Sequence, residues 1–390
     1  MRLVRIERVC AIIGLWLGCA QSLCAQAPPG EALPAPAGPV MVSPAEPLQP
    51  ILAPIPEAQA AALTNFFGGG CEACGTPPCV PGHHACLPCE SKTRIGRFGC
   101  ILYEEICCPD PCYEGRWLPL ANAAFFVDGA RPVTQTKLRF DSGINMTQPD
   151  RGEYFWARAD GNGKGPAPTA PFTGELRLNY YDLVNYTEAA TGRFSMFVET
   201  PYRSVYPEVA PHAAGFSDMN IGTKTLLFDS ELFQITFQFR TYIPVGVPSS
   251  GLGNGHASLE PSMLWAVNLA RETYWQGKIA EWIPLGGDPN YSGAILHYHS
   301  SLNRTLWYMN PAVPIIGTME FNGWSFQHGS YTDPYLGGLF QASGTTYASA
   351  GAGVRWVFCD KIDFGVAFAQ AITHNHFASQ LIRSEFRWRF

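Results

Sequence analysis

The most concentrated set of chemically capable side chains in this sequence is a run of cysteines. Nine of the 13 cysteines lie between residues 71 and 112, namely Cys71, Cys74, Cys79, Cys86, Cys89, Cys100, Cys107, Cys108 and Cys112. Two Cys-x-x-Cys pairs among them have the spacing of a zinc ribbon. In an exported chain, however, a short segment with little core of its own favours disulfides. We predict disulfides, with a metal site and redox chemistry as alternatives. Nine is odd, so one thiol is free, pairs with Cys359 or bonds another molecule.

A second group that invites a chemical interpretation is the stretch LHYHSSLN, with His297, His299, Ser300 and Ser301. A barrel phospholipase uses a serine, a histidine and a polar orienting group on its outer wall. Neighbours two apart on one strand are about 6.6 Å away, so a His–Ser hydrogen bond would have to form across strands. We therefore expect histidines that face a barrel interior, and no enzyme. His374 and His376 are expected in a turn, and no cofactor or metal is predicted.

The third group is the last ten residues, LIRSEFRWRF. Four ionic side chains alternate there with apolar and aromatic ones, and the final residue is Phe390. An arginine that faces lipid at mid-membrane costs roughly 2 to 4 kcal/mol. A polar lumen on one side of this ribbon and lipid on the other would avoid that cost. We expect Phe386, Trp388 and Phe390 to face lipid and to form the C-terminal assembly signal of an outer-membrane barrel, read by the barrel-assembly machinery.

The organisation of the whole chain fits an exported β-protein. Residues 1–25 are predicted to be a signal peptide, with Arg2, Arg5 and Arg8 before an apolar stretch; a signal anchor and a lipoprotein at Cys19 are the alternatives. Residues 26–66 form a Pro/Ala-rich disordered tether. Residues 67–116 form the cysteine-rich segment, expected in the periplasm, and residues 117–390 form the barrel. Charged residues are only 15% of the chain and the net charge is -6, which argues against nucleic-acid binding.

From about residue 117, segments with a period of two recur between breaks that contain glycine, proline or asparagine. The clearest is LFQITFQFRTYIPVG, in which Phe233, Ile235 and Phe237 alternate with Gln234, Thr236 and Gln238. Several segments reach the 9 to 11 residues that a membrane-spanning strand needs. Residues 131 to 390 accommodate about twelve strands at roughly 20 residues for each strand and its connection. The sequence predicts an all-β, antiparallel, up-and-down transmembrane β-barrel of about twelve strands, with 10 and 14 as the neighbouring possibilities.

The polar faces of these segments supply the candidates for a pore lining. We expect the following side chains to point into the lumen: Lys224, Gln234, Gln238, Arg240, Arg383, Glu385, Arg387 and Arg389. Such an ion ladder can tune selectivity in an open pore or close a narrow one through salt bridges. Packing and charge balance inside the barrel are the alternative role for each of them.

One stretch resembles a known family. Gly215, Asp218, Gly222 and Lys224, followed by Pro244, Gly246 and the loop Gly251-Leu-Gly-Asn-Gly255, are similar to an outer-membrane transporter family labelled as a MetA pathway of phenol degradation. Ser217 and Val245 depart from the glycine and threonine of that pattern. The resemblance is specific over about 215–285 and does not include the cysteine-rich segment. It implies a barrel that passes hydrophobic or aromatic solutes.

Taken together, these patterns predict an outer-membrane channel or transporter for small solutes, in contact with outer-membrane lipid. One alternative is a structural envelope barrel, crosslinked to the cell wall or to itself through the cysteines. An outer-membrane lipid hydrolase is the third. The transported solute and the oligomeric state do not follow from the sequence.

Overall fold

The computed structural model describes most of the barrel and little of what precedes it. The described residues are 91–93, 95–97, 99–100, 103, 125–147, 164–165, 177–208, 210–270, 272–310, 313–332, 339–376 and 378–390. The predicted signal peptide and tether lie outside them. The chain divides into two compact units, of which residues 21–114 form one. None of the described helices is long and apolar enough to cross a membrane.

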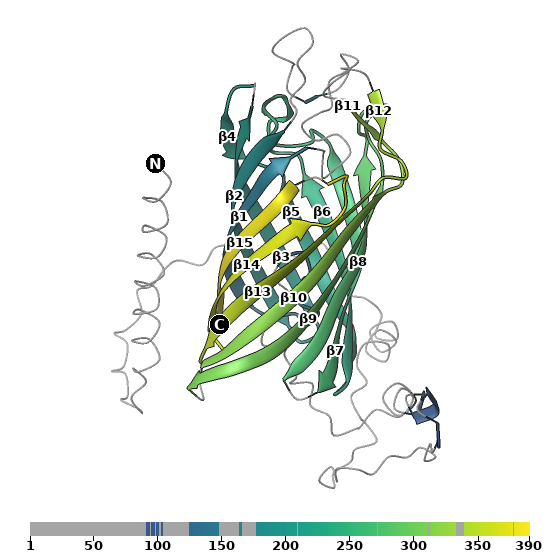
Figure 1. The fold of residues 1–390 in the computed structure, drawn as a ribbon, viewed down its shortest axis with the longest axis vertical. Helices are drawn as coiled ribbons and strands as arrows, with labels where there is room; N and C mark the ends of the chain where they lie inside the picture. The colour runs from purple at the N-terminus through teal and green to yellow at the C-terminus, as the bar shows by residue number, and fades with distance from the viewer. Residues whose placement is uncertain are drawn as a thin grey trace, which may run out of the picture. The chain divides into compact units, whose positions relative to one another are not determined.

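Twelve long antiparallel strands close into a barrel (Figure 1). They are β1 (Gln135–Met146), β2 (Leu178–Thr191), β3 (Phe194–Pro207), β5 (Met219–Asp229), β6 (Phe233–Ile243), β7 (Ala257–Ala270), β8 (Thr273–Leu285), β9 (Ile295–Asn310), β10 (Val313–Phe326), β13 (Thr346–Phe358), β14 (Ile362–Ala371) and β15 (Ala378–Arg389). Neighbours in sequence pair with each other, and β1 pairs with β15 to close the ring. The prediction of an all-β barrel of about twelve strands is confirmed.

Three short strands lie outside this ring. β4 (Ala213–Phe216) pairs with β3 next to β5, and Ser217 and Asp218 separate β4 from β5. β11 (Ser330–Thr332) and β12 (Leu339–Gln341) form a separate two-stranded ribbon between β10 and β13.

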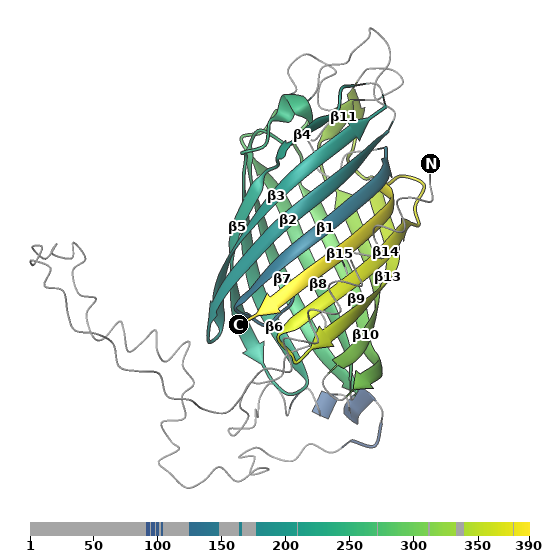
Figure 2. The same cartoon turned by 90° about the vertical axis from the view of Figure 1, so that its left-hand side faces the viewer.

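The two ends of the barrel differ in the length of their connections. At one end, which we call the turn end, β1 begins opposite the end of β15, and adjacent strands are joined by two or three residues, as at 192–193 and 359–361. At the other, the loop end, the connections are mostly longer, as at 147–177 and 244–256. Figure 2 shows β1, β2 and β3 side by side with β15 along the strongly tilted wall. Bacterial outer-membrane barrels have their short turns in the periplasm.

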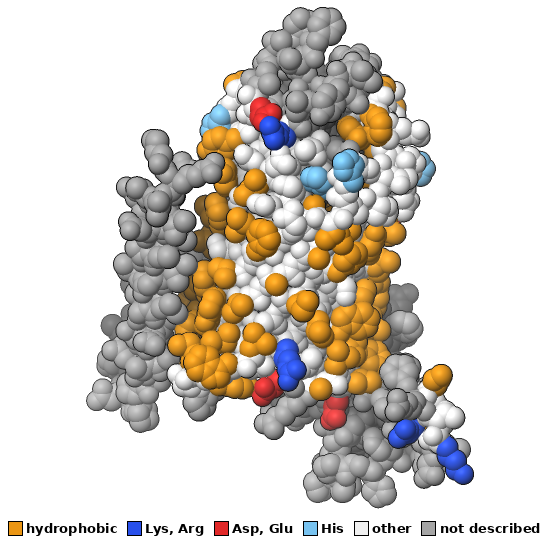
Figure 3. Space-filling model, in the orientation of Figure 1, with side chains coloured by type: hydrophobic (Ala, Val, Ile, Leu, Met, Phe, Trp, Pro, Cys, Tyr) orange, Lys and Arg blue, Asp and Glu red, His pale blue; other side chains and the backbone are white. Residues whose placement is uncertain are grey.

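The outer wall of the barrel is apolar. Strand residues that point outward include Leu183, Met196, Leu306, Met319 and Trp388, each between 48% and 68% exposed. On the face drawn in Figure 3, hydrophobic side chains spread over the wall, and the few charged ones lie toward its two ends. Exposed apolar surface of this extent is unfavourable in water and suits contact with lipid.

The alternate residues point inward and are largely polar. Buried lysines, arginines, aspartates and glutamates lie on β1, β2, β3, β5 to β8, β10 and β13 to β15. The period of two in each strand produces this separation, because successive side chains lie on opposite faces. The barrel is thus apolar outside and ionic inside, the reverse of a soluble protein.

Candidate functional site: a plugged polar lumen

A segment that precedes the first strand lies inside the barrel. Residues Phe125–Thr134, which we call the plug, contact strands around the whole ring. The Thr236 hydroxyl on β6 donates to the Ala130 carbonyl at 2.5 Å, and Arg131 pairs with Asp229 at the end of β5. Asp128 accepts from Arg240 on β6 at 3.0 Å and lies 3.5 Å from Lys278 on β8. The plug therefore occupies the lumen instead of forming part of the wall.

The tip of the plug is held by one carboxylate. Glu320 on β10 is 3% exposed, and its two oxygens accept from the backbone N–H groups of Phe125 (2.9 Å) and Phe126 (2.7 Å). Arg383 on β15 donates to the Phe125 carbonyl. The Phe126 ring stacks on His299 at 5.3 Å and meets the edge of Trp324 at 5.0 Å. Charge-assisted bonds to backbone N–H groups are among the stronger hydrogen bonds in proteins, so we call Glu320 the latch of the plug.

Charged side chains of four neighbouring strands meet in a network beside the plug. Arg383 donates to both oxygens of Asp141 (2.5 and 2.8 Å), and Arg139 pairs with Asp141 (2.8 Å) and Glu199 (3.3 Å). Separately, Arg203 makes a bidentate pair with Asp182 at 2.7 and 2.6 Å. Planar guanidinium groups match carboxylates in this two-bond geometry. The arrangement links the adjacent strands β15, β1, β2 and β3 along one side of the interior.

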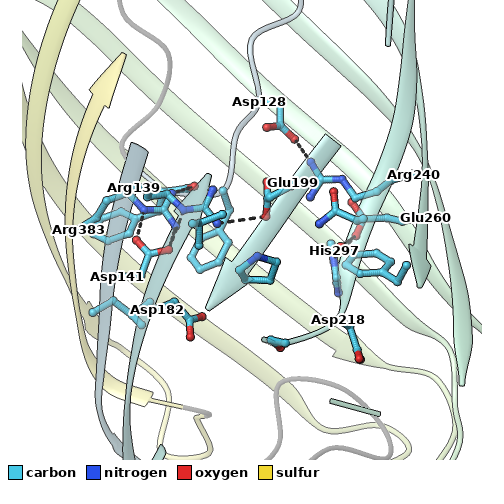
Figure 4. A pocket seen from close by; sticks show the side chains of 18 of the residues that line it. Asp128, Arg139, Asp141, Asp182, Glu199, Asp218, Arg240, Glu260, His297 and Arg383 are labelled. Atoms are coloured by element: carbon cyan, nitrogen blue, oxygen red, sulfur yellow. Dashed lines mark hydrogen bonds and ion pairs between the residues drawn. The ribbon is translucent and has the colours of Figure 1, made fainter. Parts of the chain in front are cut away.

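A cavity of about 160 Å³ lies beside the plug tip, toward the loop end. Figure 4 shows the charged side chains that point into it, including Asp128, Arg139, Glu199, Arg240 and Glu260. Four of its rings are Phe125, Phe126, Trp282 and Trp324. The wall of the cavity thus combines aromatic surfaces with paired charges. Its volume is about that of one small ring, because an engineered cavity of about 150 Å³ in another protein holds benzene.

At the loop end of the cavity, a carboxylate fastens the connection between β6 and β7, residues 244–256, which we call the inner loop. Asp218, 4% exposed, accepts from the backbone N–H groups of Gly246 (3.1 Å) and Asn254 (2.8 Å). A Cβ added to Gly253 would lie 2.3 Å from the Asp218 carboxylate. Glycine is required there because the backbone passes so close to the acid. Asp218 and Gly246 belong to the stretch at 215–285 that was singled out in the sequence. Their contacts indicate that Asp218 holds the inner loop in place.

Replacing Asp218 with alanine is expected to loosen the inner loop. Two buried backbone N–H groups would lose their acceptor, at a cost of about 1 to 3 kcal/mol each. We expect the Gly246 and Asn254 amides to exchange with deuterium at least ten times faster, in a barrel that remains folded.

The matched control for this prediction is Asp288→Ala. Asp288 accepts from the Asn290 N–H at 2.8 Å in an exposed loop between β8 and β9, so its loss should leave the inner loop unchanged. Unchanged exchange of Gly246 in the Asp218 variant would contradict the role assigned to Asp218.

A second ionic network lies near the turn end. Asp363 on β14 is fully buried and lies between three arginines: it pairs with Arg355 and with Arg389 (2.6 Å), and Arg387 lies 3.8 Å away. Glu385 accepts from Arg355 at 3.0 Å and from Arg387 at 2.7 Å. On the opposite wall, Lys224 and Glu188 form a pair at 3.2 Å in which both side chains are fully buried.

The structure places all eight predicted lumen residues inside the barrel, each at most 8% exposed. These eight residues belong to separate clusters of contacts. Arg383 lies at the plug tip and Arg240 at Asp128, whereas Glu385, Arg387 and Arg389 belong to the turn-end network. Gln234 donates to Asp229 at 3.1 Å, and Gln238 accepts from Ser262 at 3.3 Å. On the outer face, Trp388 and Phe390 are 52% and 67% exposed.

The two histidines of the LHYHSSLN stretch and the second of its serines also face inward. His299 and Ser301 are 3% and 1% exposed, and Ser301 accepts from the Asn303 amide at 3.1 Å. Ser300 faces outward and accepts from the Trp275 indole at 2.7 Å. His299 and Ser301 therefore lie on the lumen side, not on the outer wall where a phospholipase site would be. His374 and His376 lie in the connection between β14 and β15.

Two cysteines are among the described residues. Cys100 is buried and Cys359 lies in the turn between β13 and β14 with φ 50°; both are disulfide-bonded. The other eight cysteines between 71 and 112 lie outside the described residues. Within the described ranges, no group of three or more histidine, cysteine, aspartate or glutamate side chains is placed to hold a metal ion.

Sequence reasoning missed the plug, the latch Glu320 and the fastening role of Asp218. The plug has no alternating pattern, and residues 125–134 were included in the barrel. Glu320 and Asp363 did carry a signal, because each is an acid at an inward position of an alternating segment.

Comparisons with known proteins give only the general fold. No family model matches the chain, and no curated protein matches it. An outer-membrane channel from Pseudomonas putida F1 aligns with a TM-score of 0.46 at 9% identity, over 69% of this chain and 100% of that one. The β domain of the Bordetella autotransporter BrkA gives 0.40 at 9%, over 66% and 100%, and the NanC porin gives 0.37 at 6%, over 65% and 100%. None of these three reaches 0.5, so the description of the fold rests on the strand pairing itself.

Proposed function

We propose that this protein is a gated outer-membrane channel for small solutes. The observation that carries the proposal is the reversal of polarity: an apolar outer wall surrounds an ionic interior in a closed barrel. Lipid requires every backbone polar group to be paired internally, which a closed barrel achieves. Packing alone does not account for a charged lumen, because apolar side chains would fill the interior without the desolvation cost of buried charges.

The plug acts as the gate of this channel. Hydrogen bonds and ion pairs hold it in the lumen, beside smaller apolar contacts at Phe125, Phe126 and Ala130. Water can replace such contacts when the plug moves, whereas a large apolar interface would hold it permanently. The lumen residues predicted from the sequence are the wall along which solutes pass once the plug is displaced.

The solutes are small and carry a ring or an apolar body. The cavity beside the plug tip has the volume of about one ring, and Phe126, Trp282 and Trp324 line it. The resemblance of residues 215–285 to the transporter family supports the same class. The outward Phe386, Trp388 and Phe390 serve as the assembly signal, and the cysteine-rich segment is periplasmic and disulfide-bonded.

Planar-bilayer recording of the detergent-purified full chain, with and without reductant, tests this function. We expect discrete and reproducible conductance steps that are infrequent, because the plug closes most molecules. Heat-modifiable migration in gels verifies that the sample is folded. Permanent silence from folded protein, also after the plug latch is removed, would contradict a channel. Extraction from membranes without detergent would contradict the membrane barrel itself.

A further inference from the structure

One acid in the wall of the cavity belongs to the plug. Six carboxylates of the described residues line the cavity, and Asp128 is the one that the plug contributes. The other five lie on the long strands or, at Asp218, directly before β5. Each of these five has a partner on the strands or on the inner loop. Displacement of the plug would therefore remove one carboxylate from the cavity and leave the other five with their partners.

Asp128 lies between two cations of the barrel wall. It accepts from Arg240 on β6 at 3.0 Å, the contact drawn as a dashed line in Figure 4, and lies 3.5 Å from the Lys278 ammonium on β8. Lys278 also pairs with Glu260 at 2.7 Å. Asp128 is the only carboxylate in the described part of the chain within ion-pair distance of Arg240, while Glu260 and Glu199 act on Arg240 from farther away. Two cations thus share two close carboxylates, of which Glu260 alone stays when the plug leaves.

Departure of Asp128 leaves a positive site in the wall. Arg240 and Lys278 are 8% and 4% exposed, and a buried charge that loses its partner is costly. The carboxylate of a solute offers Arg240 the same oxygens that Asp128 offers, and planar guanidinium groups match carboxylates closely. An acid group from outside can therefore replace the one that the plug withdraws.

The space next to Asp128 accepts a ring. The cavity of about 160 Å³ has the volume of about one small ring, and Phe126 and Trp282 contribute to its wall together with Arg240 and Lys278. Aromatic side chains stack favourably on other rings. A ring in this cavity brings an attached carboxylate to the part of the wall where Asp128 lies.

We infer that Arg240 and Lys278 bind the carboxylate of a small aromatic acid, and that Asp128 of the plug competes with this acid for them. The inference rests on the proposed function, because Asp128 leaves its place only when the plug moves. It narrows the solutes from rings in general to rings with one negative charge. A neutral ring would leave the two cations with one close carboxylate, and a cationic ring would add to the excess of positive charge.

Calorimetric titration of the full chain in detergent tests this competition. The probes are benzoate, benzyl alcohol and benzylamine, which share a ring and differ in charge. In Asp128→Asn the competing charge is absent and the shape of the side chain is retained. We expect the affinity for benzoate, relative to that for benzyl alcohol, to rise about tenfold over the wild type, which corresponds to about 1.4 kcal/mol. Benzylamine should show no such rise.

A second substitution in the Asp128→Asn protein tests the cation. Arg240→Gln restores the balance of charge and should abolish the preference for benzoate, whereas Arg240→Lys should retain most of it. Heat-modifiable migration in gels verifies that each variant is folded. No binding of benzoate to Asp128→Asn, or a preference for benzoate that survives Arg240→Gln, would overturn the site.

Asp229→Asn is the matched control for a plug that is merely looser. Asp229 pairs with Arg131 of the plug, and neither residue lines the cavity. A gain in affinity that comes only from loosening the plug applies to all three probes, so the ratio of benzoate to benzyl alcohol should stay at the wild-type value. An equal rise of this ratio in Asp229→Asn and Asp128→Asn would contradict competition by Asp128.

Bilayer recording separates this inference from the proposed channel. Conductance steps from a protein whose Asp128→Asn variant shows no preference for benzoate would refute the site and leave the channel intact. The expected preference in a protein that gives no steps, also after Glu320→Ala, would refute the channel and leave the site.

Discussion

Replacing the latch Glu320 with alanine is expected to raise the frequency of channel openings by about two orders of magnitude. The carboxylate accepts from two backbone N–H groups at the tip of the plug, and it is buried. Hydrogen bonds to charged groups contribute about 1.5 to 3 kcal/mol each. Losing both shifts the plug equilibrium by about 3 kcal/mol or more, and every 1.4 kcal/mol is a factor of ten. Single-channel recording measures the change directly.

Glu281→Gln provides the control for this experiment. Glu281 is also a glutamate on a long strand, but it accepts from Gln327 at an exposed position on β8. Its replacement should leave the opening frequency unchanged. An opening frequency in Glu320→Ala equal to that of the wild type, in protein verified as folded, would show that the plug is not held by this carboxylate.

The second large effect is on stability. Asp363→Asn is expected to destabilise the barrel by about 3 to 5 kcal/mol, because breaking a buried ionic network leaves uncompensated charge. Asp363 is fully buried and lies next to Arg355, Arg387 and Arg389, and Glu385 pairs with the first two of these arginines. The measurement is the midpoint of urea unfolding in lipid vesicles, followed by the heat-modifiable shift in gels.

Asp360→Asn is a close comparison for that variant. Asp360 lies three residues earlier in an exposed turn with φ 56°, and asparagine tolerates this left-handed conformation well. Arg389 donates to the Asp360 backbone carbonyl at 3.2 Å, and the substitution retains this bond, so the unfolding midpoint should change little. Equal midpoints for the two variants would mean that the arginines near Asp363 find other partners.

The interior of this barrel explains why charges that are costly elsewhere are retained here. An ionic lumen is stable only if its charges are paired across strands, as Asp141 and Arg383 are on β1 and β15. The same ion pairs link the first and last long strands. The pairing of charges therefore also stabilises the closure of the ring.

The sequence by itself determined the elements of this barrel and their inner and outer faces. A strand has a period of two, so Gln234 and Gln238 could be placed inside, and Phe237 outside, from their alternation alone. The strand length and the spacing of breaks gave the strand number, because a membrane sets both. The alternation also placed the acidic residues of these strands on the inward face, but it did not show which basic groups they contact.

Only the tertiary structure decided which charges meet and what fills the lumen. Arg383 and Asp141 are far apart in the chain and become neighbours through ring closure. The plug carries no periodic pattern, because its hydrogen bonds are made with strands from all around the ring instead of with one regular neighbour. Such long-range contacts depend on the closed barrel, so local patterns in the sequence contain no signal for them.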